Sequence, residues 1–194
     1  YHSGQLHIPI LVCPETYMEE NPGSKVYVFD SLSTGPEIMM IVDKLKELLD
    51  QGLDFETIRD KVLEYNNHNH TLFCLASMTN LARNGRVNPA VAKIAGVLGI
   101  RIVGKASVQG TLEPTDKCRG EAKSLTTILA HLKAHGLSAG KVQIAHCSNE
   151  QAARKLKAMI QTEIPGASVA IGENRGLCSY YAEVGGLLVG YEKM

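Results

Sequence analysis

The order of strand and helix patterns in the sequence predicts an α/β protein. Near the start, a strand pattern, two helix patterns and another strand pattern follow one another, and this order favours a parallel or mixed sheet covered by helices. In the middle, two extended segments flank the turn dipeptide Gln109-Gly110, which is typical of a hairpin and adds antiparallel pairing. The last third alternates helix with strand. We therefore expect helices packed on a mixed sheet, with a domain boundary near residues 83–88.

The first half of the chain carries the β-α-α-β pattern. Lys25–Phe29 is rich in β-branched and aromatic residues, and the loop after it, residues 30–36, is rich in helix-capping residues. Apolar residues then recur at helical spacing over Glu37–Leu49 and again over Asp54–Asn66. The short apolar run Thr71–Leu75 indicates the next strand.

The second half continues with alternating elements. Asn88 and Pro89 provide a helix N-cap followed by proline at the first helical position, which predicts a helix to about Leu98. The other expected elements, in chain order, are a short helix Met78–Ala82, strands Ile100–Val108 and Thr111–Arg119, helix Glu121–His135, strand Lys141–His146, helix Asn149–Glu163, strand Ser168–Ile171, a short helix Ser179–Glu183 and strand Leu187–Tyr191.

Composition excludes several classes of function. The 194 residues carry 20 Lys and Arg against 20 Asp and Glu, so the chain lacks the excess of positive charge that is typical of nucleic-acid-binding proteins. Hydrophobic residues make up 44% but aromatic residues only 5%, and Trp is absent. Any apolar cavity should therefore be lined mainly by aliphatic side chains.

The cysteines and apolar runs indicate a cytoplasmic protein. The five cysteines are widely spaced and form no C-x-x-C pair, which fits neither a disulfide framework nor a zinc cluster. The apolar run Ile8–Cys13 is interrupted by Pro9 and is too short for a membrane span or a complete signal peptide, so we expect no stable membrane insertion.

Three groups of polar residues are candidate sites, each with a structural alternative. The loop with Ser31 could hold a carboxylate or phosphate, although its residues are also ordinary helix caps. His131 and His135 share a helix face, but no acidic or Cys partner stands at a recognised metal-ligand spacing. His146 and Cys147 end a strand, where nucleophiles often lie, but no third member of a triad is evident.

Three segments together resemble the DegV family of bacterial fatty-acid-binding proteins. They are the strand pattern ending in Asp30-Ser31, the stretch Leu75-Ala76-Ser77-Met78-Thr79-Asn80-Leu81-Ala82-Arg83-Asn84-Gly85-Arg86, and the segment Lys117-Cys118-Arg119-Gly120. The resemblance implies a two-domain α/β fold of which the chain covers the later two thirds: residues 1–84 as the remainder of an N-terminal domain with a mainly parallel sheet, and residues 85–194 as a C-terminal domain with a mixed sheet. Residues 5–16 depart from the family pattern, because Pro9 and Pro14 should break the family's helix there.

The resemblance also implies a function. Family members bury a long-chain fatty acid between two domains and present its carboxylate to a separate fatty-acid kinase, which makes acyl phosphate for lipid synthesis. The protein is then a carrier and not an enzyme, and its ligand is the fatty acid, with no cofactor or metal. The alternative is a small-substrate enzyme that uses His146 and Cys147 or the Ser31 loop.

The residues implied for this role fall into two groups. Tyr181 stands where many relatives have a histidine that helps to hold the carboxylate, and as a neutral phenol it can donate one hydrogen bond but supplies no positive charge. The full set expected at the fatty acid is Ser3, Ser31, Arg86, Arg175 and Tyr181. The set expected to dock the kinase is Arg101, Lys117 and Arg119.

Overall fold

A single mixed sheet organises the protein. The computed structural model describes residues 14–88, 90, 93, 99–107 and 111–193. Within them, six strands lie in the order β3-β2-β1-β6-β4-β5, and only β4 and β5 pair in parallel. The strands are β1 Asn69–Leu75, β2 Ile100–Ala106, β3 Leu112–Arg119, β4 Ala139–His146, β5 Gly166–Glu173 and β6 Leu187–Glu192.

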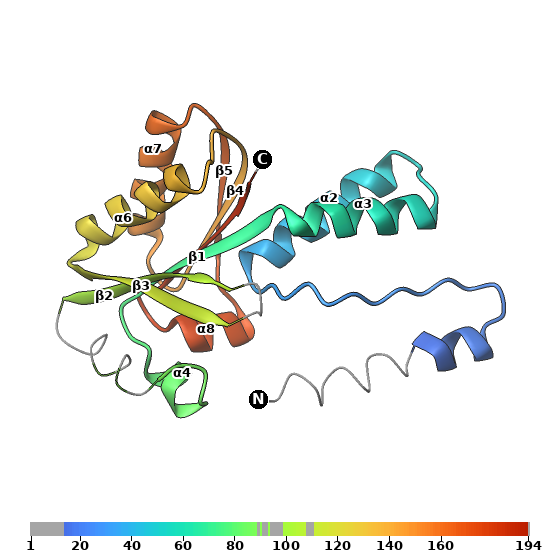
Figure 1. The fold of residues 1–194 in the computed structure, drawn as a ribbon, viewed down its shortest axis with the longest axis horizontal. Coiled ribbons are helices and arrows are strands. Elements are labelled where there is room, and N and C mark those ends of the chain that lie inside the picture. The colour runs from blue at the N-terminus through green and yellow to red at the C-terminus, as the bar shows by residue number, and fades with distance from the viewer. Residues whose placement is uncertain (1–13, 89, 91–92, 94–98, 108–110, 194) are drawn as a thin grey trace.

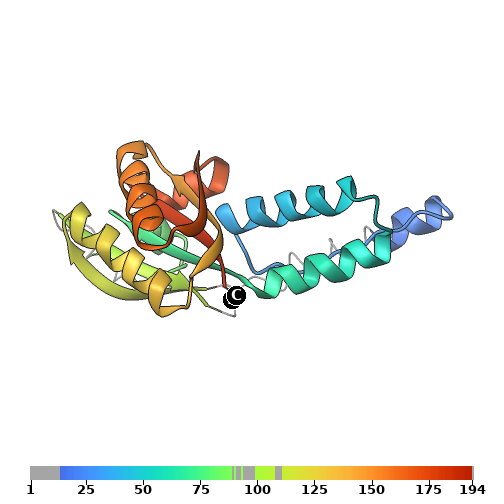
Figure 2. The ribbon, with the colours of Figure 1, turned by 90° about the horizontal axis from the view of Figure 1, so that it is seen from above.

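Helices lie on both faces of the sheet. Figure 1 shows α6 and α7 on one face, α4 and α8 on the other, and the helix pair α2 and α3 extending away from the sheet. Figure 2 shows the same pair from above, as two long helices joined by a short turn. The helices are α2 Pro36–Asp50, α3 Phe55–Asn67, α4 Thr79–Arg83, α6 Glu121–Ala134, α7 Glu150–Glu163 and α8 Gly176–Ala182. Residues 14–20 are also helical.

The larger core lies between the sheet and the two helices α6 and α7. Side chains alternate between the faces of a strand, so Leu72 and Cys74 of β1 point to this core with Ile144 of β4. Leu132 of α6 and Leu156 of α7 are fully buried against them. This core holds the sheet in place, and the opposite face of the same sheet carries a second core.

The opposite face carries a smaller core beneath α4 and α8. Phe73 and Leu75 of β1 alternate with the residues of the larger core and pack with Ile102 of β2 and Leu188 of β6. The short helix α8 contributes Ala182 to the same cluster. This smaller core borders the cavity described below.

Helix α2 begins close against β6 and then leaves the sheet. Gly190 allows the contact, because a Cβ there would lie 3.1 Å from the backbone nitrogen of Glu37 and from Sδ of Met40. Farther along, α2 packs against α3, while Val42 and Leu49 on its other side are 55% and 57% exposed. The helix pair thus presents an apolar surface to solvent.

Most of the expected elements are confirmed. The hairpin of β2 and β3, helices α6 and α7 and the final strand β6 all form at the expected places. The expected helix from Asn88 to Leu98 falls largely outside the described residues. No helix within the described part of the chain combines the length and apolarity that a membrane crossing requires.

One local expectation is wrong. Lys25–Phe29 is not a strand: residues 24–34 run without regular secondary structure, and no described strand pairs with them to form hydrogen bonds (Figure 1). The expected break of a helix at Pro9 and Pro14 falls largely outside the described residues, since only residues 14–16 of the segment 5–16 are described, and these are helical.

The mixed α/β architecture agrees with the expected fold class. Strand β1, from the segment assigned to the first domain, lies in the centre of the sheet between β2 and β6. The division into residues 1–84 and 85–194 stays a prediction.

Candidate functional site

A cavity of about 550 Å³ opens beside the smaller core. Its floor is formed by β1 and β6, and its sides by α8 and by the turn after α4. The lining residues are Thr34, Phe73, Leu75, Leu81, Asn84, Gly85, Arg86, Thr111, Leu112, Leu177, Cys178, Tyr181, Ala182 and Leu188. The lining is mainly apolar with a few polar groups, a combination that is typical of small-molecule sites.

The floor of the cavity depends on a contact between two strands. Phe73 of β1 lies opposite Gly104 of β2 in the register, and the ladder is irregular between Val103 and Gly104. A Cβ on Gly104 would lie 2.3 Å from Cζ of Phe73 and 2.3 Å from the carbonyl oxygen of Glu113. Glycine is therefore required for the ring of Phe73 to lie over β2, where it forms part of the cavity wall.

Helices α4 and α8 are joined by hydrogen bonds beside the cavity. The Asn80 side-chain amide donates to the Tyr180 carbonyl oxygen at 2.9 Å, and the Asn80 backbone N–H donates to the Glu183 carboxylate at 2.9 Å. Asn84 donates to the hydroxyl of Tyr180 at 3.1 Å. These contacts hold the two walls of the cavity together.

Several polar groups line the cavity, and we call the part beside Thr34 and Cys178 its polar side. Thr34 Oγ1 lies 3.2 Å from Cys178 Sγ, which joins the loop before α2 to α8. Gly35 follows with a φ of 53°, and a Cβ there would lie 3.3 Å from Leu188. The exposed Arg86 and the half-buried Tyr181 also line the cavity. The arrangement suits a ligand with an apolar body and a polar end.

The structure places the five residues expected at the ligand in different surroundings. Arg86 and Tyr181 both line the cavity, whereas Ser31 and Arg175 do not. The Ser31 hydroxyl accepts a hydrogen bond from the Ser33 backbone N–H at 3.3 Å, which agrees with the local structural alternative. Arg175 is the exposed residue before α8, and Ser3 lies outside the described residues.

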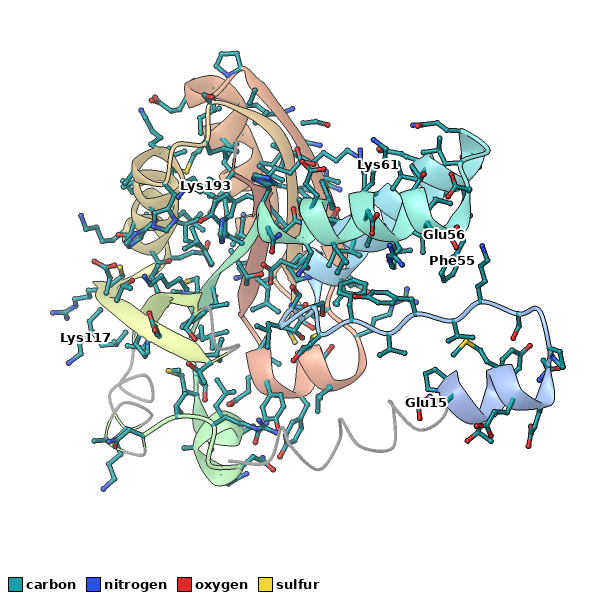
Figure 3. All side chains as sticks on the ribbon, turned by 45° about the vertical axis from the view of Figure 1, so that its right-hand side comes forward. Glu15, Phe55, Glu56, Lys61, Lys117 and Lys193 are labelled. Carbon is teal, nitrogen blue, oxygen red and sulfur yellow. The ribbon has the colours of Figure 1, made fainter. Side chains whose placement is uncertain are left out.

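The three residues expected to dock a kinase also differ. Lys117 and Arg119 are exposed on β3, which is an edge strand of the sheet, and Figure 3 shows Lys117 at the outer side of the molecule. Arg101 of β2 is only 17% exposed and hydrogen-bonds within the fold. A docking role for these residues stays a prediction.

The alternative His146 and Cys147 pair is not assembled for catalysis. His146 ends β4, is buried, and lines a groove with Glu150 of α7, whereas Cys147 packs under α8 against the smaller core. The two side chains therefore point to opposite faces of the sheet, as consecutive strand residues do. Burial also raises the pKa of the Cys147 thiol, which disfavours the thiolate that a nucleophile requires.

The other histidine candidates form hydrogen bonds instead of a metal site. His131 Nε2 lies 2.6 Å from Asp116 Oδ2, and this contact lowers the pKa of the Asp116 carboxyl. His135 Nδ1 lies 2.5 Å from the hydroxyl of Tyr191. Within the described ranges, no three His, Cys, Asp or Glu residues are arranged to hold a metal ion.

Several lining residues were not identified as ligand residues from the sequence. Phe73 and Leu188 were expected only as strand residues, and Leu112 only as part of a hairpin. Cys178 had no local signal, since its neighbour Thr34 is 144 positions away in the chain. Thr34 was included in the capping loop, where its hydroxyl was one of several possible ligands.

Comparisons with known proteins were made by sequence and by fold. A family model described as an uncharacterised protein of the DegV family matches residues 13–193. A DegV domain-containing protein of Streptococcus pneumoniae is 42% identical over 176 residues, which cover 91% of this chain and 63% of the relative. The chain therefore spans slightly less than two thirds of the length of that protein.

Two similar solved structures contain fatty acids. The Fatty Acid Kinase (Fak) B3 protein of Streptococcus pneumoniae, loaded with linoleic acid, has a TM-score of 0.92 and 40% identity, covering 97% of this chain and 67% of that one. A DegV family protein of Eubacterium eligens, loaded with heptadecanoic acid, has a TM-score of 0.91 and 40% identity, covering 95% of this chain and 67% of that one. Together with the family match, these similarities show that the chain belongs to the DegV family.

Proposed function

We propose that this protein binds a long-chain fatty acid in the cavity beside α8 and presents the carboxylate to a fatty-acid kinase for acyl-phosphate formation and lipid synthesis. The mainly apolar, leucine-rich lining of the cavity is the observation that carries the proposal. It is supported by two family members with 40% identity that were solved with fatty acids, one of which is named as a Fatty Acid Kinase (Fak) B3 protein. In this role the protein is a carrier and the chemistry belongs to the kinase.

Burial of the acyl chain should supply most of the affinity. Each buried methylene contributes about 0.8 kcal/mol, so a sixteen-carbon tail offers on the order of 10 kcal/mol before the costs of ordering are subtracted. A single hydrogen bond to the head group contributes only about 1–3 kcal/mol. Tyr181 in place of the family histidine should therefore change how the carboxylate is held without preventing binding.

We assign the carboxylate to the polar side of the cavity. Thr34 Oγ1 and Tyr181 Oη are hydroxyl donors, and Arg86 supplies a positive charge at the lining. Ser3, Ser31 and Arg175 stay in the proposal as predicted contributors, although Ser31 and Arg175 do not line this cavity. This placement leaves the carboxylate near exposed residues, from which a second protein can reach it.

The kinase should dock on the side of β3. Lys117 and Arg119 carry two positive charges on the exposed side of an edge strand, and an acidic surface would complement them. Arg101 belongs to the predicted set but is held inside the fold, so its contribution to docking should be small. We place the protein in the cytoplasm, because ATP, which the kinase uses as a substrate, is present there.

Lipid analysis tests the proposal directly. The protein is produced in bacteria, purified, extracted under denaturing conditions and examined by mass spectrometry, and the chain extended to the full length of its relatives is treated in parallel. We expect about one fatty acid per protein molecule in the extended form. Absence of lipid from both forms, with no binding of labelled palmitate or oleate, would contradict the proposal.

A further inference from the structure

A network of polar groups, most of them half-buried, surrounds the turn that follows α8. Arg101 of β2 donates from Nη1 to the carbonyl oxygen of Gly185 at 2.9 Å, and from Nη2 to the Glu121 carboxylate at 3.1 Å. The side-chain amide of Asn149 donates to the same two acceptors, at 3.1 Å to Gly185 and at 3.3 Å to Glu121. Lys155 Nζ lies 3.6 Å from the other oxygen of Glu121. The network thus joins four segments: β2, helix α6, helix α7 with the residue before it, and the turn after α8.

The turn is conformationally demanding. Glu183 is not a glycine and yet has a φ of 52°, and Gly185 has a φ of 90°. A Cβ on Gly186 would lie 2.3 Å from the carbonyl oxygen of Ala182. Non-glycine residues adopt such values of φ only where surrounding contacts impose them. The hydrogen bonds from Arg101 and Asn149 to Gly185 are contacts of this kind.

The same turn supports the wall of the cavity. Tyr181 and Ala182, which line the cavity, directly precede it. Backbone hydrogen bonds between Gly185 N–H and the Cys147 carbonyl oxygen, at 2.8 Å, and between Cys147 N–H and the Gly186 carbonyl oxygen, at 2.9 Å, attach the turn to the end of β4. The position of α8 over the ligand therefore depends on the position of this turn.

We propose that Arg101 is a positioning residue for ligand retention: it fixes the turn at Gly185 and so holds α8 closed over the fatty acid. This role rests on the proposed fatty-acid binding. Arginine suits the position because its planar fork donates to the carbonyl oxygen and to the carboxylate at the same time. The donors of lysine lie on one ammonium nitrogen at the end of a flexible stem. Lysine should therefore satisfy one of the two acceptors but not both.

The test measures the rate at which a fluorescent long-chain fatty acid leaves the protein in stopped-flow experiments. Loss of hydrogen bonds to a charged group should accelerate dissociation in Arg101→Gln by about tenfold or more, while the association rate changes little. Arg101→Lys should recover part of the loss. Arg154→Gln is the matched control, because Arg154 also bonds a glutamate, Glu150, but is exposed on α7 and does not line the cavity.

A purely structural role is distinguished by a second measurement. If Arg101 only stabilised the fold, Arg101→Gln would lower the unfolding temperature without faster ligand release. A double-mutant cycle with Glu121→Gln should be non-additive for the dissociation rate, since Arg101 and Glu121 act in one network. Hydrogen exchange of the Gly185 and Gly186 amides in the ligand-free protein should accelerate in Arg101→Gln but not in Arg154→Gln.

The outcomes separate this inference from the proposed function. If the wild-type protein binds no fatty acid, the proposed function is overturned, and the retention role of Arg101 with it. If the wild type binds but Arg101→Gln releases the ligand within about twofold of the wild-type rate, only the role of Arg101 is overturned.

Discussion

Thr34 and Cys178 are 144 positions apart in the chain, and their side chains meet with Oγ1 and Sγ separated by 3.2 Å. The contact connects the loop before α2 with helix α8 at the polar side of the cavity. A ligand in the cavity must therefore lie against both segments. The reactivity of the Cys178 thiol should therefore show whether the cavity contains a ligand.

We expect bound fatty acid to protect Cys178 from alkylation. Cys178 is half-buried and lines the cavity, so the reaction should slow by roughly tenfold or more at saturating ligand, because only the ligand-free form reacts. Peptide mass spectrometry after iodoacetamide treatment measures the rate. Cys147 is an internal control, since it is also half-buried but does not line the cavity. Equal protection of the two thiols would show that the ligand lies elsewhere.

The hydroxyl of Tyr181 should contribute modestly to binding. Tyr181→Phe removes one hydrogen bond to the carboxylate, for which a loss of about 1–3 kcal/mol is expected, and keeps the apolar ring in the wall. The dissociation constant for oleate should rise by about fivefold or more without a change in circular dichroism. Tyr27→Phe is the control, because Tyr27 is 47% exposed and is not part of the lining. An unchanged dissociation constant for Tyr181→Phe would remove this residue from the head-group site.

The close approach of α2 to β6 should make Gly190 intolerant of a side chain. The added Cβ in Gly190→Ala would lie 3.1 Å from backbone atoms of Pro36 and Glu37, which cannot rotate away. Overpacking of this kind costs about 1–3 kcal/mol of unfolding free energy, measurable by urea denaturation. Gly172→Ala is the matched strand control, since its nearest neighbour is 3.5 Å away. Equal stabilities of the two variants would contradict the contact.

Glu37 should make stability depend on pH. It is 5% exposed, and burial raises the pKa of its carboxyl above the ordinary 4.5, while the hydroxyls of Thr71 and Ser33 partly oppose the increase. The folded state therefore holds this proton more tightly than the unfolded state, and stability contributed by the protonated form is lost as the pH rises above 4.5 through the raised pKa.

Comparison with Glu37→Gln measures this effect. The amide cannot ionise, so the unfolding temperature of the variant should rise relative to the wild type as the pH increases from 4.5 to 8. Near pH 4.5, where more than half of the folded wild-type protein carries the proton on Glu37, the two proteins should differ least. A difference that is constant over this range would show that Glu37 has no such linkage.

The exposed apolar side of α2 should promote association. Val42 and Leu49 are more than half exposed, and apolar patches on a protein surface are typical of contact sites. Val42→Lys combined with Leu49→Lys should reduce dye binding to apolar surface and light scattering at high concentration. Glu64→Lys on α3 changes the net charge by the same two units without removing apolar surface. If that control reduces association equally, charge is the cause and not the apolar side of α2.

Helices and strands could be predicted from the sequence better than the residues of the cavity. The paired strands β2 and β3 and helices α6 and α7 have local signals, namely turn residues and helical spacing, so their predicted positions are confirmed. Lys25–Phe29 has the local signal of a strand, but a strand also needs a neighbour, and local patterns do not specify one. The cavity brings together residues as distant as Thr34 and Cys178, and their proximity follows from strand order. Arg86 and Tyr181, which line the cavity, were predicted as ligand residues from a family resemblance, which carries information about tertiary structure.

The central position of β1 and β6 has a consequence for biosynthesis. In the described part of the chain, the sheet consists of a three-stranded part, β1 to β3, and a parallel pair, β4 and β5, and only β6 joins them, although it follows the other five strands in sequence order. During translation, the parts emerge from the ribosome before the strand that unites them. Long-range pairing of this kind slows folding and leaves strand edges exposed meanwhile. We therefore expect the nascent chain to complete its fold only after β6 has been synthesised, and to bind chaperones until then.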